Sequence, residues 1–226
     1  MFWDFRQSNV VTCLLLVVAV FAFADGQKSG LYFDATVGAA YSSFLSKHDV
    51  EYELNGEKIQ TDATRTLYHG FGPAVDVKVG GAGEIFALYF DLQLMYSSGS
   101  LEKSKSTLTR REHFEWDESS RRLMLGMGFT AFPFRNPESL MHGSFAGLSL
   151  GVMSVSVDVS KNAVSSGIEE QGFSVSIELG KLWTLSDRWS VGVACVGTAD
   201  GPIRFGEDVP DYYFYTAWLG VKVVRR

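Results

Sequence analysis

His142 and Ser144 are the residues of this chain best suited to covalent chemistry, and a single glycine separates them. Side chains of a strand alternate between its two faces, so this spacing predicts that both lie on one face. A histidine beside a serine, oriented by a carboxylate, is the arrangement that activates serine for acyl transfer. Glu178, on the next expected strand, is the candidate carboxylate. A polar turn residue is the better interpretation of His142, so we assign no catalytic residue and expect no enzyme.

Residues that bind metals do not cluster along the sequence. The histidines stand in different segments, with no two at ligand spacing: His48, His69, His113 and His142. Acidic residues gather in two polar stretches, which we interpret as solvated loops: Asp49, Glu51, Glu53, Glu112, Glu115, Asp117 and Glu118. The glycine-rich stretch 80–84 precedes no expected helix, so it does not predict phosphate binding. We therefore expect neither a metal nor a cofactor.

Residues 1–24 are typical of a secretory signal peptide, with a retained N-terminal anchor as the alternative. The stretch 10–24 is an almost unbroken apolar run that ends in Ala22-Phe23-Ala24, a typical cleavage site. Cleavage leaves residues 25–226 as one exported domain. Its single cysteine, Cys195, excludes an intramolecular disulfide. The net charge of −6 and the lack of a basic stripe argue against nucleic-acid binding.

Beyond the signal, the apolar residues follow a period of two and form no run long enough for a membrane helix. From Leu31 to Tyr41 every second residue is apolar, which indicates a strand with two unlike faces. The pattern returns in further segments: 67–79, 86–96, 123–131, 144–159, 173–179, 189–195 and 213–223. A change of parity near Met153 predicts a one-residue bulge, and Pro73 predicts another. The sequence thus predicts an all-β protein of eight strands.

The second face of these strands distinguishes a soluble sandwich from a membrane barrel. A soluble protein would carry many Lys and Glu there, but this face holds mainly Gly, Ser, Thr and Ala. Sparse charges of both signs are mixed in: Asp34, Asp76, Lys78, Asp91, Arg122, Glu178 and Lys222. Such a face suits a narrow, enclosed lumen, and the large apolar face then meets lipid. We predict an eight-stranded antiparallel up-and-down transmembrane β-barrel whose lumen holds an ion network.

The connections alternate in length, as in barrels with long outer loops and short periplasmic turns. The long polar stretches include 45–64 and 98–120, whereas 80–84 and 185–187 are short. Aromatic residues gather where the strands are expected to cross the membrane interfaces. They are Phe33, Phe86, Trp183 and Trp189 at the inner rim, and Tyr41, Tyr96, Phe173, Tyr213 and Tyr215 at the outer rim.

This arrangement resembles the small eight-stranded outer-membrane β-barrels of Gram-negative bacteria, of the outer-membrane protein A or X kind. The resemblance implies an integral outer-membrane location after export, contact with outer-membrane lipid and a closed or nearly closed lumen. It also implies a structural or surface-recognition role, with a surface ligand bound through loops 45–64 and 98–120. We expect a monomer. The chain departs from the family at its end, Val223-Val224-Arg225-Arg226, where such barrels usually finish on an aromatic residue.

Three alternatives stay open. A small-solute channel would require the ion network to open. A lipid-modifying acyl hydrolase would use His142 and Ser144, which are similar to the H-x-S element of outer-membrane lipid A deacylases. The expected topology, however, places His142 at the periplasmic rim. A soluble exported β-protein would invert the inner and outer faces.

Overall fold

The structure, a computed structural model, describes residues 30–54, 57–106, 111–134, 136–161, 164–202 and 211–226. The expected signal peptide, residues 1–24, lies outside these residues. Within the described part of the chain, no helix is long and apolar enough to cross a membrane.

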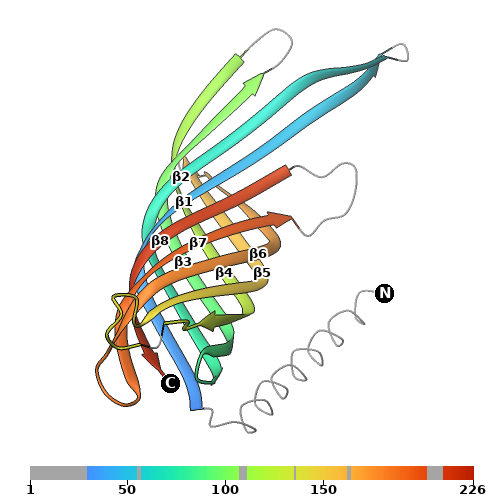
Figure 1. Cartoon of the computed structure of the whole chain (residues 1–226). Coiled ribbons are helices and arrows are strands. Elements are labelled where there is room, and N and C mark those ends of the chain that lie inside the picture. The colour runs from blue at the N-terminus through green and yellow to red at the C-terminus, as the bar shows by residue number, and fades with distance from the viewer. Residues whose placement is uncertain (1–29, 55–56, 107–110, 135, 162–163, 203–210) are drawn as a thin grey trace, which may run out of the picture.

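The chain winds around one axis as consecutive antiparallel strands (Figure 1). Their bounds are β1 Gly30–Leu54, β2 Glu57–Ala82, β3 Phe86–Ser106, β4 Arg111–Ala131, β5 Ser144–Lys161, β6 Val164–Thr184, β7 Trp189–Pro202 and β8 Asp211–Arg225. Strand β1 also pairs with β8, and this pairing closes the barrel. Closure gives every strand of the wall two neighbours, which is the condition for satisfying its backbone groups in lipid. The predicted eight-stranded antiparallel up-and-down barrel is confirmed.

The strand register sets the width of the barrel. Following the paired residues once around the wall from Phe33 leads back to β1 at Ser43, ten residues further along the strand. With eight strands, this stagger tilts each strand by about 40° and leaves an interior that side chains can fill. The lumen is therefore a packed core.

The outer wall is apolar, whereas the inner face combines charged and polar side chains with apolar ones. Leu219, Val221 and Leu150 are more than half exposed on the outer wall, whereas Lys78, Lys222 and other charged residues are buried inside. This is the reverse of a soluble protein and suits a wall surrounded by lipid. The predicted assignment of the apolar face to the outside agrees with this burial.

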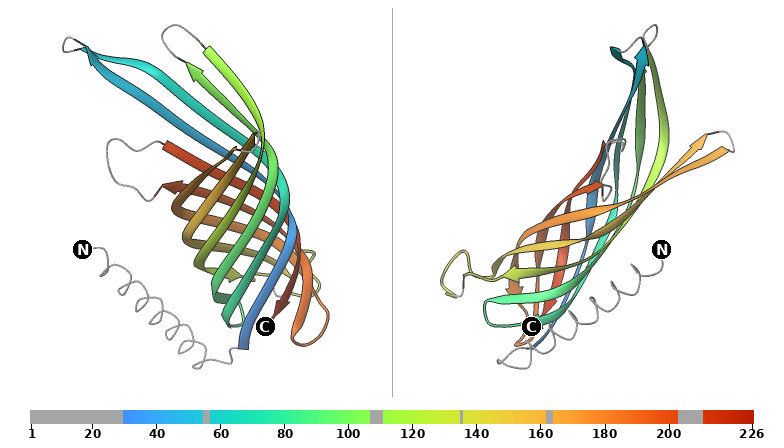
Figure 2. Two further views of the ribbon diagram at one scale, coloured as in Figure 1. Left: turned by 180° about the vertical axis from the view of Figure 1, so that it is seen from behind. Right: turned by 90° about the vertical axis from the view of Figure 1, so that its right-hand side faces the viewer.

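Two of the predicted outer loops are strands in the structure. Stretch 45–64 falls largely within β1 and β2, and stretch 98–120 largely within β3 and β4. These hairpins continue far past the rest of the barrel, while the connections at the opposite end, near the C-terminus, are compact (Figures 1 and 2). Strand alternation was not visible in these stretches because a sheet beyond the membrane needs no apolar face.

Neither predicted bulge occurs. The register of β5 against β4 and β6 is continuous through Met153, so the change of parity is real and the valines enter the lumen. Val155 and Val157 are buried there, and Ser154 and Ser156 are turned to the outer wall. At Pro73 the β2–β3 pairing is interrupted and resumes in the same register, because proline has no N–H to donate.

Candidate functional site

The centre of the lumen is crossed by a chain of ion pairs from opposite walls. Lys78 on β2 contacts Asp76 at 2.8 Å and Glu178 on β6 at 2.5 Å. The same Glu178 binds Lys222 of β8 at 2.6 Å, and Lys222 also contacts Asp34 of β1 at 2.5 Å. Glu178 is thus held between two lysines, one from each side. All five side chains are almost completely buried.

A second group of charges lies nearer the long hairpins. Arg122 on β4 donates from Nε to Oδ2 of Asp200 at 2.7 Å and from Nη2 to Oδ1 at 2.9 Å. Arg122 also donates to Ser174 and to the amide oxygen of Gln93, whose own Nε2 donates to Asp91 at 3.2 Å. Every lumen charge predicted from the sequence is therefore buried, and each is linked to at least one other polar group.

Asp200 was missed by the sequence analysis, which placed it in a loop after the seventh strand. In the structure β7 runs to Pro202, and Asp200 faces inward. The signal was present: the inward parity of Ser190, extended along the strand, reaches Thr198 and Asp200. After Cys195, no large apolar residue marks the outward face of this strand, so its end could not be located from the sequence.

Above the ion pairs, toward the long hairpins, the lumen is filled by hydroxyl groups and aromatic rings. Ser97 shares short hydrogen bonds with Ser42 and Ser120, both at 2.7 Å, and Tyr68 donates to the Ser97 carbonyl at 3.0 Å. The Phe44 and Phe214 rings lie at the same level and are also buried. The lumen is thus packed over several successive layers.

Glu118 lies beyond these layers, at the outer mouth. It was expected in a solvated loop, but it is only 4% exposed, and neither carboxylate oxygen has a hydrogen-bond partner. Burial raises the pKa of Glu118 to about 7. Its strand partner Gly99 lies three residues beyond Tyr96 of the outer aromatic rim, so Glu118 lies outside the membrane-spanning segment.

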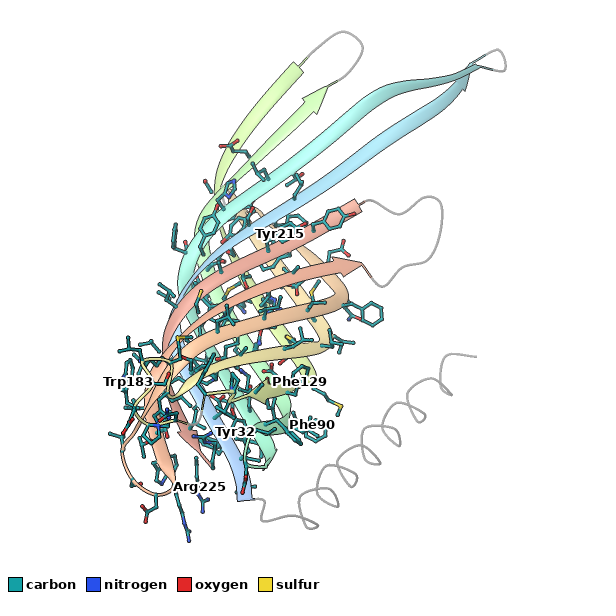
Figure 3. All side chains as sticks on the ribbon, in the orientation of Figure 1. Tyr32, Phe90, Phe129, Trp183, Tyr215 and Arg225 are labelled. Carbon is teal, nitrogen blue, oxygen red and sulfur yellow. The ribbon has the colours of Figure 1, made fainter. Side chains whose placement is uncertain are left out.

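The predicted rim aromatics lie on the outer wall. Figure 3 places Trp183 near the compact end of the barrel and Tyr215 toward the long hairpins. Phe33 is half-buried, and the other predicted rim residues are more exposed. The outer rim also includes His69 and Phe71, which the prediction omitted: Tyr41 hydrogen-bonds to His69 at 2.5 Å, and its ring lies 5.0 Å from that of Phe71.

The structure does not assemble the candidate acyl-transfer group. His142 lies in the turn before β5 rather than on a strand, and Ser144 is the first residue of β5. Glu178 is engaged by Lys78 and Lys222 in the lumen. Among the described residues, Nδ1 of His142 has no hydrogen-bond partner, so no carboxylate holds the ring through this atom as the catalytic arrangement requires. The side chains of His48 and His113 lie outside the described set, and the described residues contain no metal-ligating cluster.

A closed barrel of eight antiparallel strands, apolar outside and filled with paired charges inside, defines the class: the small outer-membrane type of β-barrel. No protein-family model matches the chain, and no curated protein matches it.

Several solved structures are similar to the chain. Neisserial surface protein A has 9% sequence identity and a TM-score of 0.45, over 88% of this chain and 99% of that one. The outer membrane protease OmpT from Escherichia coli has 8% identity and a TM-score of 0.44, over 88% and 97%. Ail, the attachment invasion locus protein of Yersinia pestis, has 9% identity and a TM-score of 0.40, over 84% and 98%. At these identities and TM-scores, the likeness carries no information on activity.

Proposed function

We propose that this protein is an integral outer-membrane barrel whose role is surface recognition, and that it binds a polypeptide at the free edges of a projecting β-sheet. The sheet consists of the outer parts of β1 to β4. One observation carries the proposal: these four strands stay paired with one another beyond the points where, among the described residues, the pairing of β1 with β8 and of β4 with β5 ends.

The register gives the extent of each free edge. Pairing of β1 with β8 ends at Lys47 and Asp211, whereas β1 stays paired with β2 to Leu54. Pairing of β4 with β5 ends at Glu118, whereas β4 stays paired with β3 to Arg111. In the described part of the chain, residues 48–54 and 111–117 therefore have a strand neighbour on one side.

A free edge presents backbone N–H and C=O groups that an extended segment of another protein can pair with. Bulges are one way in which proteins protect such edges. The β1–β2 register shifts between Val50 and Glu51, whereas the β3–β4 register is continuous to Arg111, so the β4 edge is the more regular of the two. The two edges here stand at the end with the long hairpins, which faces the cell exterior in barrels of this class. These features favour strand addition by a polypeptide partner.

The filled lumen favours recognition over conduction. Lys78 and Arg122 each reach across the barrel to a carboxylate on a distant strand, and the hydroxyl layer lies above them. Passage of a solute would require these buried pairs to separate, at a cost of several kcal/mol for each stranded charge.

The first test is the membrane location. Cells expressing the chain are fractionated, and boiled and unboiled detergent extracts are compared on a gel. We expect recovery with the outer membrane and a heat-dependent shift in mobility. Recovery as a soluble periplasmic protein would refute the membrane part of the proposal.

The second test uses photo-crosslinking on whole cells exposed to candidate extracellular proteins. A photo-reactive residue replaces Val50 on the β1 edge or Phe114 on the β4 edge. The matched control replaces Thr66 of β2, which is paired on both sides, with Ser46 and Lys103. Polypeptide adducts at the edges and not at Thr66 support strand addition. Adducts at all three positions, or at none, contradict it.

A shortened variant separates folding from recognition. His48 and Thr64 are strand partners, so residues 49–63 can be replaced by an Asn-Gly turn without altering the barrel below. We expect this variant to keep the heat-dependent shift and to lose binding of the polypeptide that the residue at position 50 captures in the full-length chain, measured as retention of that polypeptide on whole cells.

A further inference from the structure

A groove crosses the outer wall over strands β2 to β5 and has a volume of about 400 Å³. Its outward-facing lining consists of Pro73, Val75, Leu94, Tyr96, Arg121, Leu123, Ser154 and Ser156. The lining is mainly apolar toward the compact end of the barrel. Toward the long hairpins it carries an arginine, a tyrosine and a serine.

The strand register sets the order of these side chains. One outward row, on successive strands, consists of Leu94, Leu123 and Ser154. The next outward row, toward the long hairpins, consists of Tyr96, Arg121 and Ser156. Arg121 therefore lies at the level of the outer aromatic rim, with a tyrosine on one side and a serine on the other.

This level is also where the apolar part of the wall ends. Below it, the outward residues of these three strands are Leu92 and Leu94 on β3, Leu125 and Leu123 on β4, and Leu150 and Val152 on β5. Arg121 follows as the first charged residue on the outward face of β4. An aromatic ring and a cation at the upper end of an apolar wall lie where lipid headgroups meet the protein.

The polar row is complementary to a phosphate group. Arg121 is exposed, and a guanidinium can donate two parallel hydrogen bonds to two phosphate oxygens. The hydroxyl groups of Ser154, Ser156 and Tyr96 offer further donors on the neighbouring strands.

The apolar row is complementary to an acyl chain. Val75, Leu94 and Leu123 present hydrocarbon along the floor and sides of the groove. A free anion would leave these side chains uncovered, and a lipid without a phosphate would leave the guanidinium without a counter-charge from its ligand. A phosphorylated lipid matches both rows at once.

We propose that this groove binds a phosphorylated lipid of the outer leaflet, with the phosphate at Arg121 and one acyl chain along Val75, Leu94 and Leu123. The site lies on the membrane-facing wall, below the projecting sheet, so it does not depend on strand addition at the sheet edges. The lipid reaches it sideways from the surrounding leaflet, and the barrel does not have to open.

The test measures lipid retention by native mass spectrometry of the barrel folded in a non-ionic detergent. The probes are lipid A, its dephosphorylated form with the same acyl chains, and inorganic phosphate. We expect the barrel to retain a single lipid A molecule and to bind the dephosphorylated form at least about tenfold more weakly. Inorganic phosphate at millimolar concentration should not displace lipid A, because it cannot fill the apolar row.

Charge variants test the polar row. Arg121→Gln should weaken retention by about tenfold. Lys181→Gln is the matched control, because it removes a cation from the outer wall near Trp183 at the opposite rim, and it should leave retention nearly unchanged. Glu169, the strand partner of Ser156, brings a carboxylate to the level of Arg121. Glu169→Gln should preserve or strengthen retention, since a carboxylate repels phosphate.

A second pair of variants tests the apolar row without changing charge. Leu123→Trp fills the groove and should weaken retention, whereas Leu150→Trp, on the outer wall beyond the groove, should not. The heat-dependent shift in mobility verifies that each variant is folded.

Three results would overturn the proposal. A folded parent barrel that retains no lipid A, or that retains the dephosphorylated form equally well, has no phosphate site on this wall. Equal losses in Arg121→Gln and Lys181→Gln would indicate general attraction of lipid to interfacial cations. A loss in Glu169→Gln as large as that in Arg121→Gln would show that Arg121 serves an ion pair within the wall.

Discussion

Arg122 on β4 and Asp200 on β7 meet across the lumen through two hydrogen bonds, Nε to Oδ2 at 2.7 Å and Nη2 to Oδ1 at 2.9 Å. This fork geometry aligns both groups of a completely enclosed ion pair. Because strands from opposite sides of the barrel supply the two residues, the pair ties together parts of the wall that share no backbone ladder.

Removing one partner of this pair should be costly. Asp200→Asn leaves the Arg122 guanidinium buried without a counter-charge, and we expect the free energy of unfolding to fall by about 3–5 kcal/mol. The double variant Arg122→Met with Asp200→Leu should lose less than Asp200→Asn alone, because no charge is left unpaired. Urea unfolding in vesicles measures both. Equal losses in the single and double variants would contradict the role given to the stranded charge.

A charged side chain at mid-height on the outer wall should destabilise the folded barrel. Leu219 is 67% exposed and lies midway between Tyr215 and Val223 on β8. Leu219→Arg should reduce the free energy of unfolding in vesicles by about 2–4 kcal/mol, since the guanidinium would sit in hydrocarbon. Leu140→Arg is the control, because Leu140 is 90% exposed in the turn before β5. A tolerated arginine at position 219 would contradict a lipid-facing wall.

Close contact between β1 and β8 should depend on glycine. Gly38 pairs with Gly220, and a Cβ on Gly38 would fall on the carbonyl oxygen of Leu219. Gly38→Ala therefore forces the closing strands apart, and we expect a loss of about 1–3 kcal/mol in unfolding free energy. Gly197→Ala on β7 is the matched control, because a Cβ there meets no atom within 4 Å. Comparable losses at both positions would point to a general effect of alanine and not to crowding.

Glu118 should make the outer mouth sensitive to pH. Burial raises its pKa from 4.5 to about 7 in the folded chain. Between these values the folded state holds a proton that the unfolded state has released, so stability should fall as pH rises from about 4.5 through about 7. Glu118→Gln should flatten this part of the profile of unfolding midpoint against pH, whereas Glu102→Gln, at an exposed position, should leave it unchanged. An unchanged slope in Glu118→Gln would refute the assignment.

The strand pattern of the membrane-spanning wall could be predicted from neighbouring residues alone. Along Phe86–Tyr96, each outward apolar residue is followed by an inward one, and lipid on one side with a narrow lumen on the other enforces this contrast. The inward positions of Asp34, Lys78 and Glu178 follow from the same alternation. Beyond the membrane the contrast ends, and the outer halves of β1 to β4 were taken for loops.

By itself, the sequence determined the fold class, the strand count and the faces of the wall, because period-two patterning is a local property of each strand. Tertiary structure decided which charges meet. That Arg122 meets Asp200, and that Lys78 meets Glu178, depends on the register around the closed barrel and on side chains from distant strands. Such pairings are set by the stagger of the whole wall, which no single segment of the sequence contains.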